Sequence, residues 1–434
     1  MYSKEGILEN VRANRLQGSE WILLAALMAF CFVPSLNQLV VDRLISGLGE
    51  DVLNIAGQIE WFDLFNETIL AFLTVPLYFV LNKVSDDTGL FRSRIMQTMT
   101  AGFTVYTLLS VIIYLYANTL TAYMTAPAES IEYLRLETIG FVMSFISSYL
   151  FVVLVIRGRW AYIAALLVVR VSLLTLGDVF MIPDYGVMGL AVTNILVNLV
   201  MSLCAIWLVG RDGLLTVHFR FDRETMKDWI MTGTYSGMQI FINNLIYMLV
   251  VMKMVNDVSE MGSYWLANNF IWGWLLIPAT AYSEIIKRDF YKGYSRIWNY
   301  LLFMAALGLV WLLSVPLWGF MFTDVVCATD PDTVLSILYR LVPFYLAYIL
   351  CVVLQSVLTA VGKTDYLLYS SIFVNFGYYG IVYGLFLAGV FTASLDFVIM
   401  MFGFGMVVSA VFNLYYYLRS RRDIPREEVT SCSL

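Results

Sequence analysis

The chain of 434 residues is 60% hydrophobic and only 13% charged, with a formal net charge of -6 at pH 7. Soluble domains are about 45–50% apolar and about 25% charged, so this composition excludes a soluble globular protein and indicates one that crosses a membrane many times. The five cysteines lack the spacing of disulfide or metal motifs, and the single histidine, His218, lies in a polar loop. We therefore predict that the protein is not an enzyme and has no metal cofactor.

Apolar stretches long enough to span a bilayer, which takes about 20 residues, recur twelve times. We place them at 20–45, 52–82, 95–123, 131–156, 160–181, 187–209, 228–254, 261–286, 298–322, 333–361, 365–388 and 394–418.

The basic residues give an independent check on these spans. If the amino terminus is cytoplasmic, the odd-numbered loops between spans hold only Arg43 and Lys253, which lie at the ends of the first and seventh spans where these loops begin. Arg135, Arg170 and Arg340 fall well within spans. The remaining 21 of the 26 lysines and arginines lie at the termini or in even-numbered loops. Basic residues accumulate on the cytoplasmic side of membrane proteins. We therefore predict an integral protein of the plasma (inner) membrane with both termini in the cytoplasm.

The longest polar connection, 211–228, divides the chain into an amino-terminal lobe, 1–210, and a carboxyl-terminal lobe, 229–434. The halves resemble each other: Pro127 and Pro331 precede the fourth and tenth spans and are 204 residues apart (331 minus 127). Repeats with an even number of spans are parallel. We predict an all-α membrane protein with twelve transmembrane helices, in two six-helix lobes related by a pseudo-two-fold axis along the membrane normal, around a central cleft.

The first span contains a proline and ends near an acid. Pro34 removes a backbone hydrogen bond in mid-helix and should bend the span, so we predict a hinge there. Asp42 lies about two turns beyond it. The alternative is an ordinary helix-end acid, paired with Arg43 or with solvent.

The second span carries three acids, Glu60, Asp63 and Glu67, at the spacing i, i+3, i+7. This spacing puts them on one helical face. Each ionised acid costs about 2.5–3.5 kcal/mol near a bilayer centre, so the face should line a cavity or contact other helices. We predict that these acids bind an organic cation or exchange protons. The alternative is a solvated cavity wall, or ion pairs with Arg170 or Arg135.

Polar residues in three other spans are weaker candidates. Asp178 lies in the fifth span and is either a functional acid or an acid of the outer interface. Arg170, in the same span, either neutralises an acid or contacts an anionic substrate. The amides of Asn243, Asn244 and Gln355 either line the cleft of the carboxyl-terminal lobe or form hydrogen bonds between helices.

Three segments resemble motifs of the multidrug and toxic compound extrusion (MATE) transporters. The first, 41–57, reads VDRLISGLGEDVLNIAG, and in the family an acid of the first helix precedes a glycine-containing loop. The second, 176–196, reads LGDVFMIPDYGVMGLAVTNIL and resembles the motif that joins helices five and six. The third, 355–366, reads QSVLTAVGKTDY and resembles the end of helix ten. With the span count and the two halves, the resemblance covers essentially the whole chain and extends to the multidrug/oligosaccharidyl-lipid/polysaccharide flippase superfamily.

The resemblance implies roles for four residues. Asp42 and Asp178 match the acids that couple transport to protons or sodium, and together they form the candidate sodium site. Thr193 matches the threonine that accompanies them in helix six, and Ser148 falls where helix four contributes a polar ligand. Leu174 stands where relatives often have asparagine, which argues against a full sodium site more than against a proton site.

The function that the resemblance implies is an antiporter, coupled to protons or sodium, that exports organic, cationic compounds by alternating access. We expect a monomer in contact with membrane lipid, with no cofactor apart from the coupling ion and no nucleic-acid partner. One alternative is a flippase for lipid-linked saccharides or lipids, whose cleft should be basic; Arg135, Arg170 and Arg340 favour it. Another is a membrane receptor or scaffold that transports nothing.

Overall fold

The computed structural model describes most of the chain. In the first two helices, the side chains of residue 34 and of residues 37–65 are not described. The helical backbone of these residues is described, except for residues 47–49. The described residues are 17–46, 50–123, 129–216, 221–252, 254, 261–289, 296–325, 330–392 and 394–422.

Nearly all of the described residues are helical, the others form short turns and loops, and none of them is in a strand. Six helices come first: α2 (Gly18–Ser46), α3 (Glu50–Asn82), α4 (Thr88–Tyr123), α5 (Glu129–Ile156), α6 (Trp160–Tyr185) and α7 (Val187–Arg211). The second half of the chain contains α8 (Arg223–Ile246), η1 (Tyr247–Met252), α10 (Met261–Phe270), η2 (Ile271–Leu275), α11 (Ile277–Arg288), α12 (Ile297–Phe320), η3 (Met321–Val325), α13 (Pro331–Ala360), α14 (Thr364–Ile372), η4 (Phe373–Tyr379), α15 (Gly380–Leu387) and α16 (Leu395–Arg422), where η marks a π-helix.

Joining each π-helix to the α-helices beside it gives twelve rods over the described part of the chain. Eight helices there are long and apolar enough to cross a membrane, and two shorter apolar segments, 18–33 and 66–82, belong to α2 and α3. Helices suit this setting because lipid offers no hydrogen-bond partner to the backbone. The predicted all-α membrane fold is confirmed.

The chain divides into two compact units, Ser19–Gly237 and Met238–Leu434, the second joined by Met1–Gly18. The boundary lies inside α8, so the first half of this helix belongs to the amino-terminal unit. There it packs on α3: Trp229 Nε1 donates to the carbonyl of Leu73 at 3.0 Å, and Lys83 pairs with Asp228 at 2.8 Å. The predicted lobe boundaries at 210 and 228 stay predictions.

The start of α8 is also held to α4. Gln97 Nε2 donates to the carbonyl of Asp222 at 2.8 Å, and the Asp222 N–H donates back to Gln97 Oε1 at 3.2 Å. The carboxylate of Asp222 accepts from the Thr225 hydroxyl at 2.5 Å and from the Glu224 N–H at 3.1 Å. These bonds hold the pKa of Asp222 below its ordinary value, the Thr225 hydroxyl contributing most. They satisfy backbone groups at the beginning of α8.

Two glycines let α8 approach α3 closely. A Cβ on Gly233 would overlap the backbone of Phe72, and a Cβ on Gly237 would overlap the Phe72 ring. We expect Gly237→Ala to lower the free energy of unfolding by about 1–3 kcal/mol through overpacking, measured as a lower thermal unfolding midpoint in detergent. Gly319→Ala is the control, because a Cβ at Gly319 meets nothing within 4 Å. Equal midpoints for both variants would contradict this packing.

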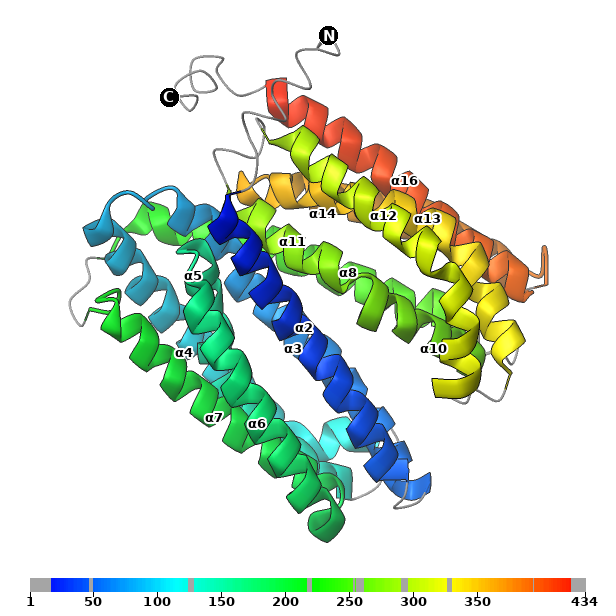
Figure 1. Cartoon of the computed structure of the whole chain (residues 1–434), viewed down its shortest axis with the longest axis horizontal. Coiled ribbons are helices and arrows are strands. Elements are labelled where there is room, and N and C mark those ends of the chain that lie inside the picture. The colour runs from blue at the N-terminus through cyan, green and yellow to red at the C-terminus, as the bar shows by residue number, and fades with distance from the viewer. Residues whose placement is uncertain are drawn as a thin grey trace. The chain divides into compact units, whose positions relative to one another are not determined.

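In the amino-terminal unit, α5 packs against α3, α4, α6 and α7, and Figure 1 shows it beside α6 and α7. Its buried face includes Phe145 and Tyr149, both fully buried. The Tyr149 hydroxyl donates to the carbonyl of Ile95 at 3.0 Å and lies 2.7 Å from the Thr98 hydroxyl. A Cβ on Gly102 would lie 2.6 Å from the Phe145 ring, so glycine there lets α4 pack tightly.

Candidate functional site

The helices α6 and α7 form a tight hairpin that brings Gly177, the residue before Asp178, against Thr193. Gly186 joins them with a φ of 58°, a conformation that glycine adopts far more readily than other residues. A Cβ on Gly189 would overlap the backbone of α6, and a Cβ on Gly177 would overlap the Thr193 side chain. The two helices therefore touch at Gly177 and Thr193, and Asp178 is the next residue of α6.

Two polar side chains, one in this contact and one next to it, are buried. Asp178 is 0% exposed and Thr193 is 1% exposed, each within an apolar span. Thr193 Oγ1 makes no hydrogen bond to any residue that the structure describes. Burying a carboxylate is costly unless it binds a proton or is compensated by a cation. Carboxylate and hydroxyl oxygens are also the ligands that hard cations prefer. The buried Asp178 carboxylate can thus hold a proton or a small cation, and the Thr193 hydroxyl lies at the contact formed by the preceding residue, Gly177.

The structure does not test the roles of the other residues predicted for ion coupling. Asp42 and Pro34 lie within α2, but their side chains are outside the described part of the chain. Ser148 is partly buried on α5, where the nearby Ser144 and Ser147 donate to carbonyls of their own helix at 2.8 and 3.0 Å. Asp42 and Ser148 as ion ligands, and Pro34 as a hinge, therefore stay predictions.

The predicted acidic face lies on α3, which is helical from Glu50 to Asn82. Glu67 is exposed, whereas the side chains of Glu60 and Asp63 lie outside the described part. The preceding residue, Asn66, accepts a short hydrogen bond from the Tyr106 hydroxyl. A small pocket between α3, α4 and α5 lies at this bond and is lined by Asn66, Ile69, Tyr106, Leu109, Ser110, Ile113 and Phe141. The residue next to Glu67 thus lines a small, mostly apolar pocket.

The basic residues within the spans have different surroundings. Arg170 lies over the ring of Phe30 in α2, 5.2 Å from its centroid. Arg135 donates to Asn118 at 3.3 Å and lies over the Tyr114 ring of α4. Arg340 forms a close ion pair with Asp396, so its charge is neutralised. Arg170 and Arg135 remain as cations in contact with aromatic rings.

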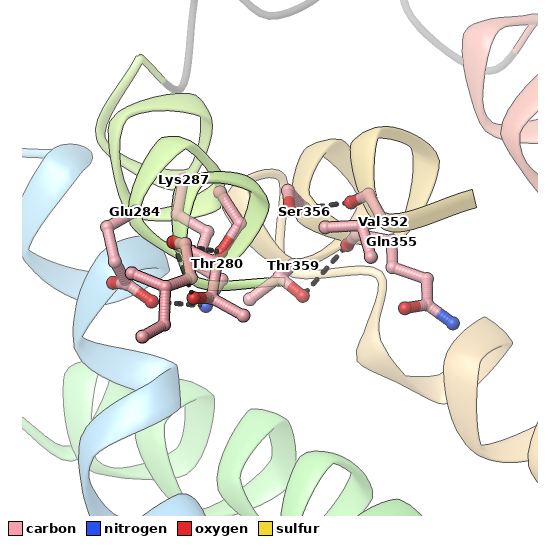
Figure 2. Close-up of polar contacts among 9 residues, drawn as sticks. Thr280, Glu284, Lys287, Val352, Gln355, Ser356 and Thr359 are labelled. Atoms are coloured by element: carbon pink, nitrogen blue, oxygen red, sulfur yellow. Dashed lines mark hydrogen bonds and ion pairs between the residues drawn. The ribbon is translucent and has the colours of Figure 1, made fainter. Parts of the chain in front are cut away.

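Polar side chains join helices in the carboxyl-terminal unit. Asn243 of α8 accepts from Ser371 of α14 and from Asn375 of η4, each at 2.7 Å. Asn244 Nδ2 is buried and makes no hydrogen bond to a described residue. Gln355 is partly buried on α13, and its carbonyl accepts from the Thr359 hydroxyl at 2.9 Å. Figure 2 shows its side-chain amide directed away from Thr359 and from the Glu284–Lys287 ion pair of α11.

A network of hydroxyl, amide and indole groups crosses the same unit. Trp272 Nε1 donates to the Tyr345 hydroxyl at 3.0 Å, and that hydroxyl donates to Asn268 Oδ1 at 3.3 Å. Asn268 Nδ2 then donates to the Tyr247 hydroxyl at 3.3 Å.

Aromatic rings surround this network. Tyr348 lies 5.9 Å from both Trp272 and Tyr345, and Phe402 lies 5.9 Å from Tyr247 and 6.5 Å from Tyr345. Tyr247 begins η1 and Trp272 lies in η2. Single-turn π-helices occur frequently at functional sites. We call the rings of Tyr247, Trp272, Tyr345, Tyr348 and Phe402 the aromatic cluster.

Two features of the structure escaped the sequence reasoning. One is the aromatic cluster, because its rings are indistinguishable in sequence from ordinary packing residues. The other is Glu137 on α5, which is 4% exposed and lies inside the fourth predicted span, 131–156. Glu137 could have been singled out from the sequence, because an acid within an apolar span indicates a functional site.

The chain matches known proteins by its structure and not by its sequence. No protein-family model and no curated protein sequence matches the chain. A MATE protein in a straight conformation is 19% identical, with a TM-score of 0.80 over 97% of this chain and 98% of that chain. A MATE protein in a bent conformation is 17% identical, with a TM-score of 0.78 over 100% of both chains.

A third match differs in its described function. A transporter of the MOP superfamily from Pyrococcus furiosus has been described as having a binding pocket of reversed polarity that suggests a different function. It is 18% identical to this chain, with a TM-score of 0.75 over 97% of this chain and 98% of that chain. These likenesses extend over nearly the whole length, and they agree with the resemblance seen in the three sequence segments. The chain therefore has the fold of the multidrug and toxic compound extrusion transporters.

Proposed function

We propose that the protein is a secondary transporter that exports organic cations in exchange for protons or sodium ions. The observation that carries this proposal is Asp178, fully buried within an apolar helix and adjacent to the contact of Gly177 with Thr193. A buried acid of this kind must gain or lose a proton or a cation to change its surroundings, which links ion binding to a conformational change. The protein acts as a monomer in the plasma membrane with both termini in the cytoplasm.

In the proposed cycle, Asp178 and Asp42 bind the coupling ion, with Thr193 and Ser148 as further oxygen ligands. Ion binding and release bias the bend of α2 at Pro34 and the alternating opening of the transporter to the two sides. The straight and bent conformations solved for MATE proteins support a fold that can move in this way. A ligand shifts such an equilibrium only by its differential affinity for the two states.

The substrate is proposed to be an organic cation because of the side chains available to bind it. Glu60, Asp63 and Glu67 of α3 supply negative charge in the amino-terminal unit. In the carboxyl-terminal unit, considered by itself, the aromatic cluster supplies ring faces without any formal charge. Cations bind over such faces with about 0.5–2 kcal/mol, most strongly over tryptophan. Trp272 is 44% exposed, so its ring is accessible while its N–H is bonded to Tyr345.

Removal of this indole should weaken substrate binding. We expect Trp272→Ala to raise the Kd for tetraphenylphosphonium about 2–30-fold, the range that corresponds to the loss of one cation–π contact. The measurement is radioligand binding to purified protein in detergent. Trp298→Ala is the matched control, because Trp298 is also exposed, at 38%, on α12 of the same unit. Unchanged affinity in Trp272→Ala would exclude the aromatic cluster from the substrate site.

The decisive experiment for the proposed function is flux in proteoliposomes under separately imposed proton and sodium gradients. We expect tetraphenylphosphonium or ethidium to move against its own gradient when one of the two ion gradients is imposed, and not in protein-free liposomes. Acceleration by only one of the ions would identify the coupling ion. The absence of flux under both gradients would instead support a receptor or scaffold.

A flippase for lipid-linked saccharides is the second candidate. Arg170 and Arg135 favour it, because each is a cation within the membrane-spanning part that contacts an aromatic ring instead of a described acid. The reversed polarity described for the Pyrococcus furiosus transporter shows that this fold accommodates different pockets. Translocation of a fluorescent lipid pyrophosphate without any flux of organic cations would favour this candidate over the antiporter.

A further inference from the structure

Pro76 lies inside the apolar segment 66–82 of α3 and interrupts the hydrogen bonding of this helix. A proline has no N–H, so the carbonyl of Phe72, one turn earlier, loses the hydrogen bond that an ordinary residue at position 76 would donate. The proline ring also pushes against this carbonyl and bends the helix. In a membrane such a break is tolerated where a neighbouring helix supplies the missing partners.

The neighbour at the break is the first half of α8, which belongs to the same compact unit as α3. Trp229 Nε1 donates to the carbonyl of Leu73 at 3.0 Å, and the Ser236 hydroxyl lies 3.4 Å from the carbonyl oxygen of Ala71. Trp229 is 4% exposed and Ser236 is 2% exposed, so both donors are enclosed. The carbonyls on either side of Phe72 therefore face hydrogen-bond donors of α8.

Gly233 lies on α8 between these two donors. A Cβ at Gly233 would lie 2.2 Å from the carbonyl oxygen of Phe72 and 3.3 Å from Cγ of Pro76. The carbonyl that the proline frees thus lies directly against the backbone of α8, at a distance that only glycine permits. Trp229, Gly233 and Ser236 are spaced i, i+4, i+7, so a single face of α8 covers the break.

The part of α3 that follows the break is fixed to its neighbours. Arg94 of α4 donates to the carbonyl of Val80 at 2.7 Å, and Lys83 pairs with Asp228 of α8 at 2.8 Å. The acids predicted to bind substrate precede the break, and Glu67 is nine residues before the proline (76 minus 67). The angle at the break therefore determines where the acid-bearing part of α3 lies relative to its fixed end.

We propose that Trp229 is a positioning residue for the acidic face of α3. Its indole N–H holds the proline break in one bend and thereby sets the place where Glu60, Asp63 and Glu67 meet the substrate. This inference rests on the proposed function, which gives these acids the role of binding an organic cation. Trp229 bonds the backbone of α3 and not an acid, so it acts through the course of the helix.

The test replaces Trp229 by benzothienylalanine, in which a sulfur atom takes the place of the indole N–H and the ring keeps its size. We expect the Kd for tetraphenylphosphonium, measured by radioligand binding to the full-length protein in detergent, to rise about 5–30-fold, the effect of leaving one buried carbonyl without its donor. The same replacement of Trp311, which is 3% exposed on α12, is the control and should leave the Kd unchanged.

A purely structural role for the indole predicts a different result. The unfolding temperature of the Trp229 variant would fall while its Kd stayed at the wild-type value, and that outcome would overturn the proposal.

A double-mutant cycle tests whether the indole acts through the break. Pro76→Ala restores the N–H at position 76, so Trp229→Phe should raise the Kd much less in this background than in the wild type, because residues that act on one feature are energetically coupled. Additive effects would overturn the proposal. If the wild-type protein binds no organic cation, the proposed function fails, and the same cycle measured in unfolding temperatures decides whether the indole holds the break: coupled values support this hold and additive values refute it.

Discussion

Replacing Asp178 with asparagine should abolish ion-driven export while the protein remains folded. Asparagine has nearly the same shape but can neither bind a proton as an acid nor offer a charge to sodium. Asp178 is fully buried within α6 and follows Gly177, the residue that contacts Thr193. We expect gradient-driven accumulation of tetraphenylphosphonium in proteoliposomes to fall about 5–150-fold, and the unfolding temperature to change little.

The matched control for this substitution lies on the same helix. Asp184→Asn makes the same chemical change at an exposed position near the end of α6, and it should leave export unchanged. Asp42→Asn, made in parallel, tests the second predicted coupling acid. If Asp178→Asn and Asp42→Asn both kept wild-type export, coupling would have to occur outside these two acids.

Adding one methyl group at Gly177 should also impair the site, through geometry instead of charge. A Cβ there would overlap Cγ2 of Thr193 and lie 2.9 Å from its Oγ1, so α6 and α7 would have to move apart. We expect Gly177→Ala to lower the free energy of unfolding by about 1–3 kcal/mol and to reduce export at the same time. Thermal unfolding in detergent and proteoliposome flux measure the two effects.

A second substitution can restore this contact. Thr193→Ser removes Cγ2, the atom that the new methyl group meets first, and keeps the hydroxyl. We expect the double variant to recover most of the stability and export that Gly177→Ala loses, as residues in direct contact are energetically coupled. Gly210→Ala on α7 serves as the control, because its Cβ would meet only Leu215 Cδ1, at 3.9 Å. Additive effects of the two substitutions would show that the helices are not in contact at this point.

Much of the fold follows from the length and placement of apolar stretches. Twelve such stretches predict twelve rods, and the described helices form twelve once the π-helices are included. The π-helices themselves could not be predicted, because one extra residue in a turn leaves the pattern of apolar residues almost unchanged. The close packing of α8 on α3 was equally hidden, since Gly233 and Gly237 reveal nothing of their partner until the helices meet.

The candidate site was predictable only in part. An acid in an apolar span indicates a functional residue, and it made Asp178 a candidate that the family resemblance then matched to a coupling acid. The same signal was present at Glu137, but its hydrogen bond to Asn194 depends on which faces of α5 and α7 meet, and local sequence does not contain that information. The aromatic cluster is even harder to predict from the sequence, because tyrosine and tryptophan are common in membrane helices both at interfaces and in packing.

The course of α8 has a consequence for the covalent continuity of the chain. Its first half carries Trp229 and Gly233, which are held on α3, although these residues follow the polar loop at 211–228. A nick in that loop therefore breaks the polypeptide without removing α8 from the amino-terminal helices. The two fragments made by such a cut would remain associated through the packing of α8 on α3. An intact backbone at the loop is therefore not required to keep the two fragments together.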